Sequence, residues 1–130
     1  MSEKQAIRTE EAPAPFQGAP YSQAIRANGL VYVSGQLALR PDSKEIVGEG
    51  IAEETEQVFT NLRAILEAAG SSLDRIVKTT VYLTSLGDFQ GMNEVYRAHV
   101  GDVPPARATV EVSGLPSGAL VEIDAIALAG

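Results

Sequence analysis

Arg107 and Glu122 are the two charged residues whose surroundings point most clearly to chemistry. Both lie in otherwise apolar segments, residues 107–112 and 119–129, which a short loop joins. A guanidinium in a partly buried surface presents a planar fork that binds a small carboxylate in bidentate fashion. A neighbouring glutamate can position and activate water. Together the two residues indicate a site that selects small carboxylic acids.

The pairing of the two segments decides whether these charges meet. An antiparallel hairpin that pairs Val112 with Ala119 gives two further pairs on one face, Thr109 opposite Glu122 and Arg107 opposite Asp124. A slip of one residue would separate them. Residue types alone support at least as well a structural or intersubunit salt bridge between Arg107 and either acid. Spacing by itself therefore does not establish a catalytic site.

Several other polar residues have both a functional and a structural interpretation. Ser34 lacks the Gly-x-Ser-x-Gly frame of a nucleophile elbow, so it is a hydrogen-bond donor or a strand-end residue. Tyr21 follows Pro20, and a semi-rigid turn there presents its ring either to a pocket or to ordinary packing. Asn93 is suited equally to bonding a ligand and to capping a loop. The single histidine, His99, is expected to be an ordinary helix-end residue.

The composition narrows the chemistry further. The chain has no cysteine, which removes disulfides, thiolate nucleophiles and thiolate metal sites. With one histidine and no EF-hand or His-x-x-x-His spacing, we expect chemistry without metal or cofactor, or binding alone.

Charge and hydropathy exclude two kinds of partner. The net charge is −7 and the ten Lys and Arg residues are scattered, which argues against nucleic-acid binding. No segment is long and apolar enough to span a bilayer, and the polar opening lacks the core of a signal peptide. We therefore expect a cytoplasmic protein with no membrane partner.

Local signals predict the elements that must position these residues. The 130 residues fit one domain over 1–130, whose residues 1–20 form an extended arm that is partly ordered at best. Asn28-Gly29 predicts a tight hairpin between strands at 24–27 and 30–33. Residues 40–50 predict a loop.

Periodicity predicts two helices and three more strands. Apolar residues recur at helical spacing over 51–69, with Glu54 on another face and Gly70 as the stop. Residues 76–84 predict a strand whose alternation puts Val77 on the same face as Thr79. A shorter helix covers 89–100, and two prolines end it. Strands at 107–112 and 119–129 follow.

The resulting order, β-β-α-β-α-β-β, predicts an α+β protein with a mixed sheet and both helices on one face. In the last strand, one face carries Val121, Ile123, Ala125 and Ala127, and the other still carries Leu120, Ile126 and Leu128. Strands that are apolar on both faces are normally covered on both. Because two helices cannot cover two faces, we expect a homo-oligomer that buries the second face.

Several motifs in sequence order resemble the Rid family, the reactive-intermediate deaminases, over about residues 12–127. They are APYSQA (19–24), VSGQ (33–36), LEAAG (66–70), PARATV (105–110) and VEI (121–123). The resemblance implies a chorismate-mutase-like α+β fold and a homotrimer with three clefts between subunits. It implies that Arg107 grips the substrate carboxylate and that Glu122 orients the attacking water.

The resemblance also implies the rest of the pocket and the reaction. Tyr21, Ser34 and Asn93 would line the pocket, and Gly35 would let the backbone approach the ligand. The implied reaction is hydrolysis of 2-imino acids or their enamines, such as 2-iminopropanoate or 2-aminoacrylate, to 2-oxo acids and ammonia without a cofactor. Thr109 stands where cysteine is frequent in the family, and Ala19 replaces a frequent glycine. Both substitutions are expected to reshape the pocket and its substrate preference.

Three alternatives stay open at the level of sequence. A trimer that binds or regulates through a small 2-oxo acid would use the same cleft without turnover. A ribonuclease or translation inhibitor, a role of some family members, fits poorly with the acidic charge. A chorismate mutase rests on fold analogy alone.

Overall fold

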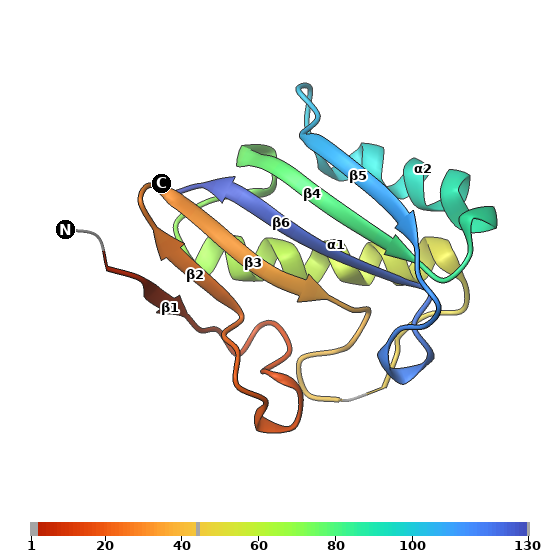
Figure 1. Cartoon of the computed structure of the whole chain (residues 1–130), viewed down its shortest axis with the longest axis horizontal. Helices are drawn as coiled ribbons and strands as arrows, with labels where there is room; N and C mark the ends of the chain where they lie inside the picture. The colour runs from red at the N-terminus through yellow and green to blue at the C-terminus, as the bar shows by residue number, and fades with distance from the viewer. Residues whose placement is uncertain (1–2, 44, 130) are drawn as a thin grey trace.

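A computed structural model describes residues 3–43 and 45–129, in which two helices cover one face of a six-stranded mixed sheet (Figure 1). The sheet order is β1-β2-β3-β6-β4-β5, and only β4 and β5 run parallel. The bounds in chain order are β1 Gln5–Ile7, β2 Ala24–Ala27, β3 Leu30–Gln36, α1 Ile51–Ala68, β4 Ile76–Leu83, α2 Phe89–His99, β5 Ala106–Glu111 and β6 Val121–Leu128. The predicted α+β class and the placement of both helices are confirmed. No helix among the described residues is long and apolar enough to cross a membrane.

The predicted hairpin and helix stop form as their residues require. Asn28 and Gly29 have φ values of 53° and 79°, the left-handed pair that a tight turn between β2 and β3 needs. Gly70 has a φ of 81°, and the N–H of Ser71 donates to the carbonyl of Leu66 at 2.8 Å. This bond satisfies a carbonyl at the end of α1, and the chain then runs through a short 3-10 helix, Leu73–Arg75, into β4.

The central strand β6 has one covered and one open face. Val121, Ile123, Ala125 and Ala127 are buried with the core residues of α1, as the alternation predicts. On the opposite face, Tyr32 of β3 lies beside Ile126, and Val110 of β5 beside Tyr82. Tyr32, Val110 and Leu128 are 43%, 41% and 44% exposed. The second sheet face is therefore apolar and uncovered in the isolated chain.

The predicted hairpin between the last two strands is wrong. β5 pairs in parallel with β4, where Arg107 lies opposite Thr79, and β6 pairs with the other edge of β4, where Glu122 lies opposite Tyr82. The unit β4-α2-β5 makes a crossover, which places β5 beside β4 in the parallel sense. The most apolar strand then fills the centre, between β3 and β4.

The N-terminal arm contains a short strand, β1, that the sequence did not predict. β1 pairs with β2 at Gln5 opposite Arg26, and the buried amide of Gln23 fixes the segment that follows. Its Nε2 donates to the carbonyls of Thr9 and Pro13 at 3.1 and 2.8 Å, and its Oε1 accepts from the N–H of Thr9 at 2.8 Å. The Gln23 side chain thus satisfies backbone groups of a segment that has no neighbouring strand to pair with in the described part of the chain. The first two residues of the predicted arm lie outside the described residues.

Two side chains lie on other faces than predicted. Glu54 is only 4% exposed, because its Oε1 accepts a hydrogen bond from the backbone N–H of Leu120 at 2.9 Å. Val77 is exposed while Thr79 is buried, because a bulge between Ile76 and Lys78 breaks the alternation at the start of β4.

Candidate active site

Arg107 projects from β5 toward α2, which holds its guanidinium on three sides. Nη1 donates to Oδ1 of Asn93 at 2.7 Å. Cζ lies 4.8 Å from the ring centroid of Tyr96 and 5.5 Å from that of Phe89. Phe89, Asn93 and Tyr96 are spaced i, i+4 and i+7, so they share one face of the helix. Stacking on aromatic rings and one amide bond fix the orientation of the charge.

Tyr96 is itself held in place from the sheet. Its hydroxyl lies 2.7 Å from Oγ1 of Thr79, a fully buried residue on β4. Thr79 is also the register partner of Arg107. The arginine is therefore positioned by a connected set of side chains that residue types alone did not single out. The helical spacing of Phe89, Asn93 and Tyr96 was the one feature of the sequence that could have predicted their common position on one face of α2.

No carboxylate pairs with Arg107 among the described residues, where the one ion pair joins His99 to Glu56. The alternative of a salt bridge to Glu122 or Asp124 within one chain is therefore excluded by the geometry. An open pocket of about 260 Å³ lies beside the guanidinium, and its lining includes Asn93 and Tyr96. We call this the arginine half-site.

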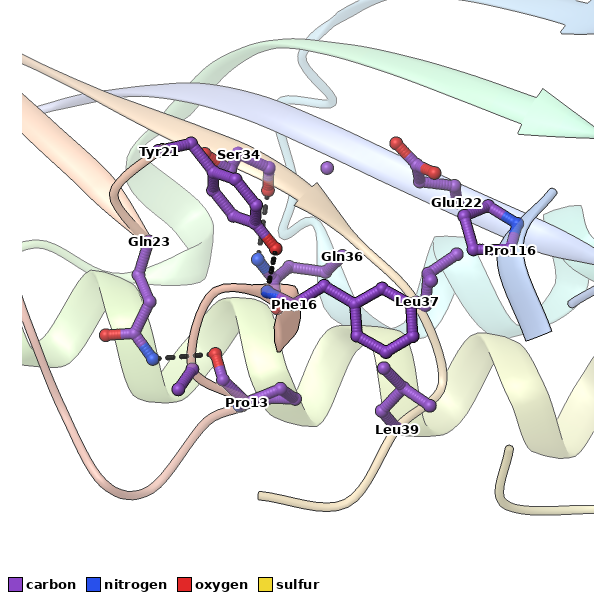
Figure 2. Close-up of a pocket in the computed structure, with 12 residues that line it drawn as sticks. Pro13, Phe16, Tyr21, Gln23, Ser34, Gln36, Leu37, Leu39, Pro116 and Glu122 are labelled. Carbon is purple, nitrogen blue, oxygen red and sulfur yellow. Dashed lines mark hydrogen bonds between the residues drawn. The ribbon is translucent and has the colours of Figure 1, made fainter. Parts of the chain in front are cut away.

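Glu122 lines a separate open pocket of about 410 Å³, which we call the glutamate half-site (Figure 2). Tyr21, Ser34 and Gly35 line the same pocket, so the structure brings together four of the residues singled out in the sequence. A bulge between Val33 and Gln36 shifts the register where β3 lies beside β6. The half-site forms at this irregular end of the strand.

Gly35 lies directly against the carboxylate of Glu122. A Cβ atom built on Gly35 would lie 2.0 Å from Oε2 and 2.8 Å from Cδ of Glu122. No side chain fits there unless the carboxylate moves. The glycine therefore acts by leaving space for Glu122 in this chain.

The hydroxyls of Tyr21 and Ser34 are oriented by the backbone. Ser34 Oγ donates to the carbonyl of Ser22 at 2.6 Å, which commits its proton. Tyr21 Oη accepts from the N–H of Phe16 at 2.8 Å, so its own proton is left to donate. Ser34 is therefore a hydrogen-bond donor, as expected, but its proton goes to the backbone. Tyr21 offers the pocket a donor, and Ser34 offers it an acceptor.

Burial raises the pKa of Glu122 above the ordinary glutamate value, and the nearby charge of Asp124 raises it further. Asp124 is stabilised where it lies, because its carboxylate accepts from the Thr80 N–H at 3.1 Å and the Tyr82 hydroxyl at 3.2 Å. A glutamate with a raised pKa is a stronger base than an ordinary glutamate, which suits it to accepting a proton from water.

The two half-sites lie on opposite faces of one sheet. Arg107 is on the helix-covered face, and Glu122 is on the open face. The expected surface shared by Arg107, Thr109 and the two acids is therefore not formed. Thr109 follows Arg107 on the covered side, where its Oγ1 is buried without a hydrogen-bond partner among the described residues. It lines neither half-site.

The structure also gives the positions of Asn93 and His99. Asn93 bonds Arg107 and caps no loop. His99 lies at the end of α2, stacked on Phe59 with ring centroids 4.8 Å apart and paired with Glu56. Within residues 3–43 and 45–129, no group of three or more His, Asp or Glu side chains is placed to hold a metal ion.

The fold and the two half-sites define a small α+β protein with an unpaired arginine on one sheet face and a glutamate of raised pKa on the other. A family model described as endoribonuclease L-PSP matches residues 9–129. The chain belongs to this family, the Rid family of the RutC- and RidA-named proteins. The resemblance that the motifs indicated is thereby confirmed.

Three similar proteins match this chain over almost their whole length. A RutC family protein of Pyrococcus abyssi is 50% identical over 124 residues, 95% of this chain and 96% of the relative. The mouse 2-iminobutanoate/2-iminopropanoate deaminase is 43% identical over 127 residues, 98% of this chain and 93% of the relative. The crystal structure of RidA from the Antarctic bacterium Psychrobacter sp. PAMC 21119 has a TM-score of 0.90 at 47% identity, covering 95% of this chain and 98% of that one.

Proposed function

We propose that this protein is a cofactor-independent hydrolase that deaminates 2-imino acids and their enamine tautomers, such as 2-iminopropanoate and 2-aminoacrylate. The main support for the proposal is that the guanidinium of Arg107 is held in place but has no acidic partner within the described part of the chain. Its guanidinium is held by an amide and two rings but faces no acid among the described residues. A fixed guanidinium without a counter-ion is prepared for a small carboxylate. The name of the mouse relative supplies the class of ligand.

Glu122 supplies the water chemistry in this proposal. Its carboxylate takes a proton from a water molecule as the water oxygen bonds to C2 of the imine, which gives a tetrahedral carbinolamine. The proton then passes to the nitrogen, which becomes an amine. Glu122 next takes the proton of the new hydroxyl group and passes it to the same nitrogen, so the C–N bond breaks, ammonia leaves and C2 keeps the oxygen as a 2-oxo group. The raised pKa of Glu122 makes its carboxylate a stronger base for the two proton abstractions. The C=N bond is already electrophilic, so orientation and charge stabilisation suffice.

The active form is a homotrimer, in which the arginine half-site of one copy meets the glutamate half-site of the next. Two observations support this part of the proposal. The half-sites cannot meet within one chain, and the open sheet face exposes Tyr32, Val110 and Leu128. A second copy of the same face would remove these side chains from water. A cytoplasmic location remains a prediction.

Two other functions compete with the hydrolase. A trimer that only binds a 2-oxo acid would need Arg107 but not Glu122. The description of the family model includes endoribonuclease activity. For this chain, the net charge of −7 disfavours binding of a phosphate backbone, and the only histidine is paired with Glu56.

The experiment that tests the proposal measures release of 2-oxo acid and ammonia from imines generated in situ by an amino-acid oxidase. Imines made from alanine, leucine and arginine are compared for the wild type, Arg107→Ala and Glu122→Gln. Acceleration by the wild type that both variants lose is the expected result. A correctly folded protein that accelerates none of the three would move the assignment to the binding protein.

A further inference from the structure

We infer that the site prefers 2-imino dicarboxylates, and that Arg97 is the residue that binds the second carboxylate. This inference rests on the proposed function and names its substrate class. Arg97 and Arg107 both line the arginine half-site, the pocket of about 260 Å³. Neither the motifs nor the proposed reaction uses Arg97.

The helix aims Arg97 at this pocket. Asn93, Tyr96, Arg97 and Val100 are spaced i, i+3, i+4 and i+7 on α2, and all four line the pocket. Asn93 is the residue that bonds Arg107. The opposite wall comes from the prolines that lead into β5, Pro104 and Pro105. A pocket lined by two prolines and two arginines suits a short carbon chain with an acid group at each end.

Within one chain the charge of the pocket is uncompensated. No Asp or Glu lines it, and neither Arg97 nor Arg107 forms an ion pair among the described residues. Asp74 lies beside Gly101 of the lining but does not line the pocket itself. In the proposed trimer, Glu122 of the next copy adds one negative charge against the two guanidinium groups, so the pocket keeps a net positive charge. That charge favours a doubly charged ligand over a singly charged one.

The chemistry divides between the two arginines. Arg107 binds the carboxylate attached to the imine carbon, where the reaction occurs, and Arg97 binds the carboxylate of the side chain. Hydrolysis is otherwise unchanged, with water adding to C=N and ammonia leaving. Arg97 is exposed, so solvent screens its contribution, and we expect a preference of about fivefold to tenfold.

The test compares imines generated in situ from aspartate and glutamate with those from 2-aminobutyrate and norvaline, which have four and five carbons respectively. The readout is the ratio of kcat/KM for the dicarboxylate to that for the monocarboxylate of equal carbon number. The wild type should favour the dicarboxylate, Arg97→Gln should bring the ratio close to one, and Arg97→Lys should restore part of it. Arg63→Gln removes an exposed arginine from α1, and this matched control should keep the wild-type ratio.

Two outcomes overturn the inference, and they differ from failure of the proposed function. Equal ratios in the wild type and Arg97→Gln, with the alanine imine still hydrolysed, remove the role of Arg97 and leave the deaminase intact. If no imine is hydrolysed, calorimetric binding of 2-oxoglutarate and 2-oxobutanoate decides the question. Tighter binding of 2-oxoglutarate that Arg97→Gln abolishes would support the pocket, and equal binding of both acids would reject it.

Discussion

Arg107 and Glu122 project from opposite faces of the same sheet. Their register partners on β4 are Thr79 and Tyr82, which are three residues apart and therefore point to opposite sides of the strand. Any chemistry that needs both groups has to bring two copies of the chain together. This relationship explains why each half-site is an open pocket in the single chain.

Replacement of Gly35 by alanine should strongly reduce activity with little effect on stability. The new Cβ would lie 2.0 Å from Oε2 of Glu122 and displace the carboxylate from its position. We expect kcat/KM for imine hydrolysis to fall about a hundredfold, since misplacement by about 1 Å costs that much in well-ordered sites. Gly114→Ala is the control, because a Cβ there meets open space. Similar losses in both variants would show that the space beside Glu122 is irrelevant.

Asn93 allows the carboxylate-binding role of Arg107 to be separated from a structural one. Asn93→Ala removes the 2.7 Å acceptor and should raise KM about tenfold, because one charge-assisted hydrogen bond is lost. Asn93→Asp keeps the shape but gives Arg107 an internal counter-ion, which competes with the substrate. KM should therefore rise more in Asn93→Asp than in Asn93→Ala, while thermal stability is unchanged or higher. A purely structural arginine would give the opposite order.

The pH dependence of turnover should report Glu122. Its pKa is raised by burial and by Asp124, and the ionised form accepts the proton from water. The rate should therefore fall as decreasing pH protonates Glu122. Asp124→Asn removes the smaller cause of the raised pKa, so the acid limb of kcat/KM should move to lower pH. An unmoved limb would assign the titration to another group.

Glu54 should make stability depend on pH in the opposite sense to an ion-paired acid. Burial raises its pKa above 4.5, so the folded state binds this proton more tightly than the unfolded state. Its stabilising effect is present at low pH and is lost as pH rises through the folded-state pKa. Glu54→Gln should flatten the dependence of the unfolding free energy in that window.

The control for Glu54 removes the acceptor as well as the charge. Glu54→Ala leaves the N–H of Leu120 without its bond and should cost about 1–3 kcal/mol, measured by urea unfolding at neutral pH. If Glu54→Gln and Glu54→Ala were equally destabilising, the hydrogen bond would not be what retains the residue at this position.

Local signals predicted the elements well because local physics decides them. Asn28 and Gly29 take up positive φ wherever they are placed in a two-residue turn, and Gly70 ends α1 for the same reason. The exceptions depend on contacts far away in sequence. Glu54 is buried by a backbone group 66 residues away, and the bulge that exposes Val77 belongs to the pairing of β4 with β6.

The types of the site residues were recognisable in the sequence, but their arrangement was not. Arg107 and Glu122 stand out because each is a charge in an apolar strand. Their relative position depends on which strands become neighbours, and the crossover through α2 outweighs the short loop that favoured a hairpin. The role of Tyr96 could not be predicted, because a tyrosine on the inner face of a helix is usually a core residue. Only the structure shows that it stacks with Arg107.

The central claim, that Arg107 of one copy works with Glu122 of another, is tested most directly by mixing two inactive variants. Arg107→Ala and Glu122→Gln are unfolded together, refolded at equal concentrations and assayed for imine hydrolysis. In random trimers about a quarter of the clefts combine an intact arginine half-site with an intact glutamate half-site. We predict that the mixture regains about that share of wild-type activity while each variant alone stays inactive. Activity that never exceeds the sum of the two separate variants would contradict a site shared between copies.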